Sequence, residues 1–250
     1  EVRVESSRNR YATGSLVHLL HASADRVSPP CAHYADCGGC SCQHMRYEAQ
    51  LAFKRGQVSD VLRRVGGLDV RVEETIGAAS PWRYRNKTRF QIDWTGGVPR
   101  IGFFARGSRR LAAVDDCLIS HPDACRSAGV FQRWMRQDGQ INTKLMPTSL
   151  TVQVSSLGHV SVLAACELGG LQGEESLVHA LATGLPSLCY VGLARKVEGA
   201  DGNESAAIRT LYDKEPFREE MDGLSLTLSP GSFLQVNHEI CARLYHYALS

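Results

Sequence analysis

The order of apolar and polar residues predicts strands at the beginning of the chain. Apolar and polar residues alternate over residues 1–5, and residues 11–22 form a second run rich in strand-forming types. Alternation with period two is typical of a strand with one buried face. Because two strands alone do not form a stable module, we interpret residues 1–30 as the end of a small β-barrel, with Pro29 and Pro30 in the linker that follows.

A helix and several further strands follow. Residues 45–65 carry Leu51, Val58, Leu62 and Val65 at helical spacing, and Gly66 ends the pattern. Strands are predicted at residues 82–90, 99–104, 111–119, 151–154, 160–163, 188–194, 206–212 and 224–228. One helix is predicted after His121 and Pro122, ending at about residue 136. Further helices are predicted at residues 173–183 and after Asn237, which is a suitable N-cap. The fold class is therefore α/β, as a mixed α+β arrangement around a mixed sheet.

Composition and charge narrow the possible partners. The 250 residues are 43% hydrophobic and 22% charged, which is typical of a soluble globular protein, and no apolar run is long enough to span a membrane. We expect a monomer without a membrane partner. The net charge is only +2, yet residues 81–110 hold eight basic residues and one acidic residue, Asp93. A local basic field on a nearly neutral chain indicates a polyanionic partner.

The predicted strand at residues 82–90 would place four cations in a row. A strand sends every second side chain to one face, and here these are Arg83, Arg85, Lys87 and Arg89. The opposite face is mostly packing surface. Four like charges in a row repel one another unless an anion neutralises them, and an RNA backbone would do so. The alternative is pairing with local carboxylates, of which Asp93 is the nearest in sequence.

Three cysteines lie at spacings that one tight loop can close. Cys31, Cys37 and Cys40 surround Gly38 and Gly39, which allow the backbone angles that such a loop needs. Thiolates select zinc or an iron–sulfur cluster, and both sites usually take four ligands. The fourth ligand could be Cys42, a nearby histidine (His33 or His44), or a cysteine from farther along the chain.

The other cysteines have simpler interpretations. Cys166, Cys189 and Cys241 lie in apolar surroundings, where a free cysteine packs as a small hydrophobic residue. The density of cysteines is far below that of small secreted scaffolds, so a disulfide framework is not expected.

Four motifs in order along the chain point to a family. They are Cys31-x5-Cys37-Gly-Gly-Cys40-x2-Gln43-His44, then Tyr84-Arg-Asn-Lys87, then Gly102-Phe-Phe followed by Cys117, and Ser229-Pro-Gly-Ser-Phe233-x-Gln235-x-Asn237. Together they resemble the RNA uracil-5-methyltransferases, especially the iron–sulfur branch that modifies ribosomal RNA. The resemblance covers nearly the whole chain.

The resemblance implies a set of cofactors, site residues and domains. It implies a [4Fe-4S] cluster on Cys31, Cys37, Cys40 and Cys117, and a site lined by Phe233 and Gln235 where S-adenosylmethionine meets the target uridine. It also implies a rRNA or tRNA partner, a TRAM/OB-like barrel end at residues 1–30, a central iron–sulfur and RNA-binding domain at 31–225, and the beginning of a methyltransferase domain at 226–250.

The chain also departs from the family pattern. The family's nucleophilic cysteine, its general-base glutamate and its glycine-rich cofactor loop lie downstream of the Gln235 motif, and this sequence ends at Ser250. We therefore expect no catalytic residue within these 250 residues and no methyl transfer by this chain alone. Two alternatives are a zinc-stabilised RNA-binding module without catalysis, and an electron-transfer iron–sulfur protein that would leave the basic residues unexplained.

Overall fold

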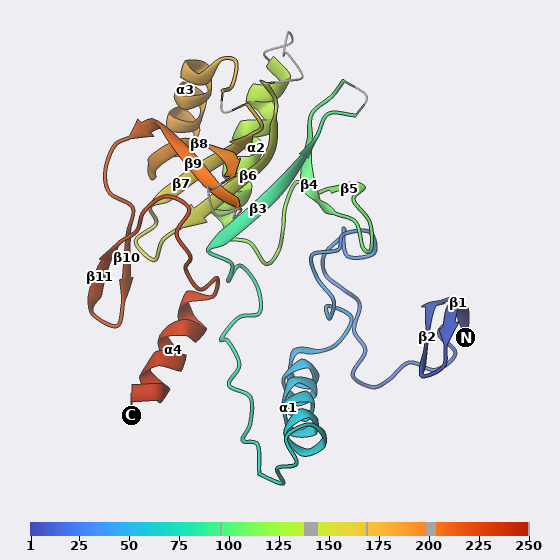
Figure 1. The fold of residues 1–250 in the computed structure, drawn as a ribbon. Helices are drawn as coiled ribbons and strands as arrows, with labels where there is room; N and C mark the ends of the chain where they lie inside the picture. Colours follow the sequence, from blue (N-terminus) through green and yellow to red (C-terminus); the bar gives the residue numbers. More distant parts are fainter. Residues whose placement is uncertain (96, 138–144, 169, 199–203, 250) are drawn as a thin grey trace. The chain divides into compact units, whose positions relative to one another are not determined.

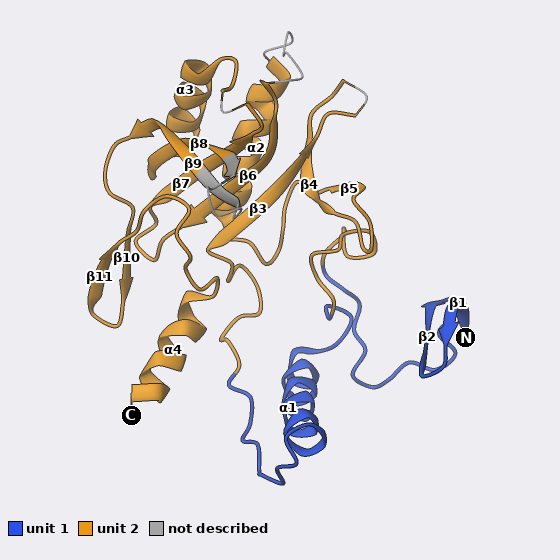
Figure 2. Cartoon of the chain, in the orientation of Figure 1, with its two compact units in different colours: residues 1–30, 42–76 blue, residues 31–41, 77–250 orange. Residues whose placement is uncertain are grey.

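The computed structural model describes residues 1–95, 97–137, 145–168, 170–198 and 204–249. The chain divides into two compact units, shown in Figure 2. Unit 1 holds residues 1–30 and 42–76, and unit 2 holds residues 31–41 and 77–250. The cysteine loop is thus part of the larger unit, although the residues on both sides of it belong to the smaller one. The division of the sequence at residues 30 and 225 stays a prediction.

Unit 1 contains a hairpin and one long helix. Strands β1 (Val2–Arg8) and β2 (Tyr11–Leu16) pair antiparallel, and α1 (Tyr47–Arg64) is the helix predicted at residues 45–65. After α1, Gly67 takes a positive φ of 65°, and the Leu68 amide donates to the Leu62 carbonyl at 3.0 Å. This is the helix ending that the glycines predicted.

Unit 2 is built around a seven-stranded sheet in the order β5-β4-β3-β6-β7-β8-β9 (Figure 1). Its strands are β3 (Lys87–Asp93), β4 (Arg100–Phe104), β5 (Leu111–Ala113), β6 (Pro147–Val154), β7 (Val160–Cys166), β8 (Leu188–Glu198) and β9 (Glu204–Asp213). Strands β7 and β8 run parallel, and the other described pairings are antiparallel. The parallel pair is joined through helix α3 (Glu174–Gly184), because a parallel connection needs a crossover.

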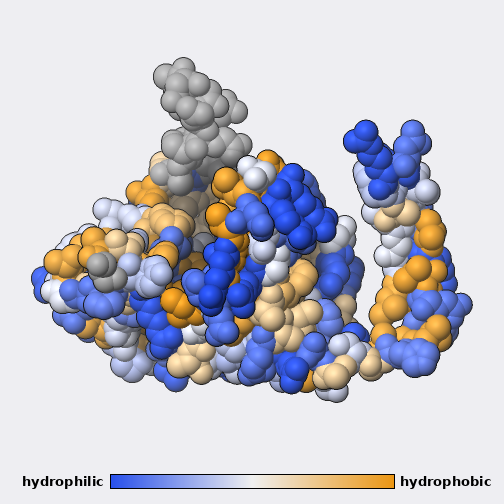
Figure 3. Space-filling model, turned by 90° about the horizontal axis from the view of Figure 1, so that it is seen from below, coloured by the Kyte–Doolittle hydropathy of each residue, from blue (hydrophilic) through white to orange (hydrophobic). Residues whose placement is uncertain are grey.

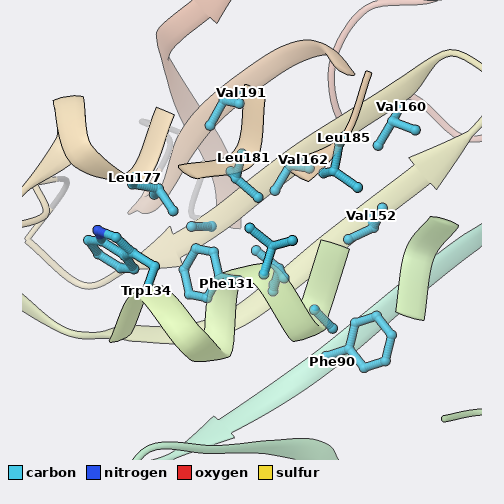
Figure 4. Packing of buried hydrophobic residues seen from close by; sticks show 14 of the residues in the cluster. Phe90, Phe131, Trp134, Val152, Val160, Val162, Leu177, Leu181, Leu185 and Val191 are labelled. Carbon is cyan, nitrogen blue, oxygen red and sulfur yellow. The ribbon is translucent and has the colours of Figure 1, made fainter. Parts of the chain in front are cut away.

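Two helices cover one face of this sheet. Helix α2 (Pro122–Gln137) contributes Phe131 and Trp134, and α3 contributes Leu177 and Leu181, to one cluster with buried sheet residues (Figure 4). On the other face Leu163, Cys189 and Tyr190 pack with Phe217, next to the hairpin of β10 (Arg218–Met221) and β11 (Leu224–Thr227). Helix α4 (His238–Leu249) follows, and the Asn237 Oδ1 accepts the Ile240 amide at 3.1 Å, which confirms the predicted N-cap.

Several sequence-based boundaries were wrong. The strand predicted at 82–90 begins only at Lys87, because Arg83 takes a φ of +59° and the amides of Arg83 and Arg85 donate to the carbonyls of Leu118 and Ile119. The strand predicted at 111–119 ends at Ala113. Strand β10 was missed because three of its four residues are charged, which hides the alternation. The mixed α/β class with a mixed sheet is confirmed.

The surface carries both apolar and hydrophilic residues. Figure 3 shows apolar and hydrophilic residues interspersed on the face seen there. Of the helices in the described part of the chain, not one combines the length and the apolar character that crossing a membrane requires.

Candidate functional site

The cysteine loop is attached to the end of strand β4. The Gly38 amide donates to the Phe104 carbonyl at 2.9 Å, and Cys37 forms an isolated antiparallel bridge with Ala105. A Cβ added at Gly38 would lie 2.8 Å from the Phe104 carbonyl oxygen, so only glycine allows this approach. The loop conformation therefore depends on a backbone contact with β4, about 65 residues farther along the chain.

Charged side chains add further links to the loop. Arg110 pairs with Asp36, and this hydrogen bond lowers the pKa of the Asp36 carboxyl. The His33 Nε2 lies 2.9 Å from the Asp115 Oδ1, and the hydrogen bond lowers the pKa of Asp115. Arg106 donates to the Cys40 carbonyl at 3.0 Å. Asp36 lies in the loop, and Asp115 lies in the segment that the loop contacts. Together these pairs hold the loop against residues 104–116.

The thiols of this region gather around Cys37. Burial raises the pKa of the Cys37 thiol, an amide hydrogen bond from Gly39 at 3.3 Å opposes that rise, and the nearby thiols of Cys117 and Cys31 add to it. A single tetrahedral metal ion would require sulfur atoms about 3.8 Å apart, given metal–sulfur bonds of about 2.3 Å. Within the described ranges, no group of three or more His, Cys, Asp or Glu could hold a metal ion. The structure thus brings Cys117 toward the loop, and the metal stays a prediction.

Cys125 is a further thiol at this place, and the sequence analysis missed it. The Cys117 amide donates to the Cys125 Sγ at 3.4 Å, and the Cys125 thiol lies 3.8 Å from the Cys117 carbonyl oxygen. Burial raises the pKa of Cys125 to about 11. The sequence did contain a signal for this neighbour. His121 lies just before α2 and Pro122 begins it, and this turn brings the chain back toward Cys117.

The basic residues do not form the predicted row. The two terminal nitrogens of Arg83 each lie 2.7 Å from an oxygen of Asp116, and Arg83 also donates to the Cys117 carbonyl at 3.0 Å. This bond lowers the pKa of Asp116. Asp93, the nearest acid in sequence, pairs instead with Arg100. Arg83 is therefore paired with a carboxylate, and this partner comes from a distant segment of the chain.

The other three cations have different environments. Burial lowers the pKa of Lys87, whose Nζ donates to the carbonyls of Ser232 at 2.8 Å and Gly231 at 3.3 Å. The Nε of Arg85 is buried and finds no hydrogen-bond partner within the part of the chain that the structure describes. Arg89 is exposed, and its Nε donates to the Ser149 Oγ at 3.1 Å. Of the four, Arg85 and Arg89 have charge available for an external anion.

Two of the sequence motifs meet directly. The backbone amide of Asn86 donates to the Val236 carbonyl at 3.0 Å, and its side-chain Nδ2 donates to the Gln235 carbonyl at 2.9 Å. Just before these contacts Leu234 is buried, whereas Gln235 is exposed and Phe233 is 79% exposed. The Tyr84–Lys87 motif thus holds the backbone of residues 231–236 so that an aromatic ring and an amide project outward.

Comparison with known proteins shows what the chain is similar to. No protein-family model matches the chain. It is 31% identical to an uncharacterized RNA methyltransferase of Clostridium tetani over 263 aligned residues, which cover 100% of this chain and 55% of the relative. A relative from Caldanaerobacter subterraneus, also an uncharacterized RNA methyltransferase, is 30% identical over 99% of this chain and 56% of its own length. The chain is thus similar over nearly its whole length to proteins named RNA methyltransferases.

A solved structure shows the same fold. The Pyrococcus abyssi tRNA (uracil-54, C5)-methyltransferase in complex with S-adenosyl-L-homocysteine matches with a TM-score of 0.72 at 20% identity, over 99% of this chain and 56% of that one. The chain spans a little over half the length of the relatives that it matches. Its four sequence motifs all lie in unit 2 or, for Gln43 and His44, at its border.

Proposed function

We propose that this chain is the RNA-binding portion of an S-adenosylmethionine-dependent RNA uracil-5-methyltransferase that acts on rRNA or tRNA. The observation that carries the proposal is the outward projection of Phe233 and Gln235 from a backbone held by Asn86 and Lys87. The family and the fold of a tRNA uracil-5-methyltransferase bound to S-adenosyl-L-homocysteine support it.

The chemistry explains what these side chains would do. Carbon 5 of uracil is a weak nucleophile, and addition of a thiolate at carbon 6 makes an enolate that can accept a methyl group. The target base must leave its stack, and an exposed aromatic ring can receive it. Phe233 would hold the base, and the Gln235 amide would bind the cofactor or the base edge. The nucleophile and the general base would come from outside residues 1–250.

Cys241 does not supply the missing nucleophile. It is only 4% exposed, and its Sγ lies 3.8 Å from the Met221 sulfur. A thiol so deeply buried is shielded from a target nucleotide.

The cysteine loop would hold a [4Fe-4S] cluster on Cys31, Cys37, Cys40 and Cys117. The donor set fits, because thiolates are the ligands of such clusters and the Gly39 amide donates to a candidate ligand sulfur. In the proposed reaction the cluster would serve structure, since methyl transfer needs no electron transfer. We also propose that residues 1–30 end a TRAM/OB-like barrel, that residues 31–225 form the central domain, and that the methyltransferase domain begins at about residue 226.

Methyl transfer tests the proposal. Labelled S-adenosylmethionine should transfer no methyl group to unmodified rRNA or tRNA with residues 1–250 alone, and should do so with a protein extended to the length of the relatives. There Gln235→Ala should lower the rate about tenfold, as expected for one lost hydrogen bond of about 1.4 kcal/mol. Turnover by residues 1–250 would contradict the assignment of the nucleophile to the missing part.

RNA binding should depend on salt through the available cations. Arg85→Ala together with Arg89→Ala should reduce affinity for structured RNA and flatten the slope of log K against log salt by about 0.7–0.9 per cation. Arg133→Ala, an exposed change on α2, is the matched control and should leave the slope as it was. If the double variant has the wild-type slope, Arg85 and Arg89 do not contact phosphates.

A further inference from the structure

We propose that Asn86 and Lys87 are positioning residues that set the backbone of residues 231–236, and that the Lys87 charge is used on this segment and not on RNA. The inference rests on the proposed role of Phe233 and Gln235 in the cofactor and base site. It differs from the sequence-based interpretation, in which Lys87 belonged to a phosphate-binding row.

The contacts of Lys87 carry the first step. Its ammonium group lies between two carbonyl oxygens of one turn, those of Gly231 and Ser232, at 3.3 and 2.8 Å. The turn is closed by the Ser232 amide, which donates to the Ser229 carbonyl at 3.0 Å, and Gly231 takes a φ of +84°. A charged donor shared by two carbonyls is among the stronger hydrogen-bonding arrangements in a protein. Lys87 therefore stabilises the turn from which Phe233 projects.

Asn86 carries the second step. It is 7% exposed, its Nδ2 donates to the Gln235 carbonyl, and its own carbonyl accepts the Val154 amide at 2.7 Å. Asn86 therefore joins the end of β6 to the segment before α4. In extended backbone, fixing the carbonyl of a residue also fixes the side to which its side chain points. The Asn86 amide thereby directs the side chain of Gln235 outward.

Buried polar atoms without hydrogen-bond partners lie on Asn86 and on residues close to it and to Lys87. They indicate a functional site and not only a structural contact. Among the described residues, Arg85 Nε, Asn86 Oδ1 and Gln153 Nε2 are buried without a hydrogen-bond partner. Gln153 pairs with Lys87 across β6 and β3. Each such atom costs about 1–3 kcal/mol. Departures of this kind from optimal stability are expected at functional positions.

The test places a single reporter on the segment. A 4-fluorophenylalanine at position 233 of the whole chain gives one ¹⁹F NMR signal from a side chain that is mostly exposed. Lys87→Met, which keeps the length and removes the charge, should shift and narrow this signal as the turn loosens. It should also speed amide exchange at Ser232 at least about tenfold, since a charge-assisted hydrogen bond contributes about 1.5–3 kcal/mol. Lys87→Arg, which keeps charged donors, should restore part of both effects.

The matched control is Arg89→Met, two residues along the same face of β3. It should leave the ¹⁹F signal and Ser232 exchange unchanged, and should reduce RNA affinity and its salt slope.

Asn86→Ser, which removes the donor to Gln235, is a second variant in case Lys87→Met fails to fold, and it should also speed exchange in the segment. Wild-type exchange in both foldable variants, or a salt slope reduced by about 0.7–0.9 in Lys87→Met, would overturn the inference. If neither Arg89→Met nor Lys87→Met changes RNA binding, the assignment of RNA contacts to this strand fails. The ¹⁹F and exchange data still decide the role of Lys87.

Discussion

Serine in place of Cys31, Cys37, Cys40 or Cys117 is expected to abolish iron binding and to lower the yield of folded protein. Serine offers a hydroxyl where the cluster requires a thiolate. The wild-type chain, purified without oxygen, should be brown and contain iron and acid-labile sulfide. Each of the four variants should be colourless, as measured by visible absorption and by iron and sulfide content.

Two neighbouring thiols serve as controls for this experiment. Cys42→Ser and Cys125→Ser should keep the colour, because neither belongs to the proposed ligand set, although Cys125 lies against the backbone of Cys117. Loss of metal in Cys42→Ser with retention in Cys117→Ser would show that the assignment is wrong. Bound zinc without visible absorption would support the alternative of a zinc-stabilised module.

Gly102→Ala is expected to disrupt the pairing of β4 with β5. A Cβ at this position would lie 2.0 Å from the Ala112 carbonyl oxygen and 2.9 Å from the Ala113 Cα, so the two strands would have to separate. Overpacking of this kind costs about 3 kcal/mol or more when backbone cannot move aside. A loss of that size corresponds to about 6–12 °C in melting temperature for a chain of this length.

The matched control is Gly129→Ala, within α2. There the new Cβ would meet only the end of the Arg133 side chain, at 3.6 Å, which is an ordinary contact. Because glycine is unfavourable inside a helix, this variant should be more stable by about 0.5–1 kcal/mol. An equal effect of both substitutions on thermal unfolding would refute the steric argument at Gly102. Iron content of Gly102→Ala should also fall, since the cysteine loop depends on β4 for its attachment.

Periodicity predicted the elements of the fold better than their boundaries. The places of helix α1 and strands β6 to β9 were predicted by helical spacing or by runs of strand-forming residues. The apolar stripe predicted on α1 is not buried, since α1 has no buried residue, whereas β7 is buried along almost its whole length. The segment before β3 did not follow, because the amides of Arg83, Arg85 and Asn86 donate to the carbonyls of Leu118, Ile119 and Val236, which lie outside the strands of the sheet. Which partners these backbone groups bond to depends on tertiary contacts, and the local sequence does not reveal those contacts.

The candidate site shows the same division. The motifs predicted Cys31, Phe233 and Gln235 as members of a site, because their residue types and spacing are specific, and this assignment stays a prediction. They did not reveal that Arg83 pairs with Asp116, or that Cys125 joins the thiols. Partners so far apart in sequence become neighbours only when the sheet has formed, and alternation along one strand cannot show which carboxylate will neutralise which cation.

The attachment of the cysteine loop has a consequence for the order in which the protein is made. The contacts described above for this loop, from Gly38 with Phe104 to His33 with Asp115, close within the first half of the chain. The turn that Lys87 holds leaves the ribosome more than a hundred residues later, on the order of ten seconds at ordinary rates of synthesis. The nascent chain can therefore form the cysteine loop before the segment bearing Gln235 exists.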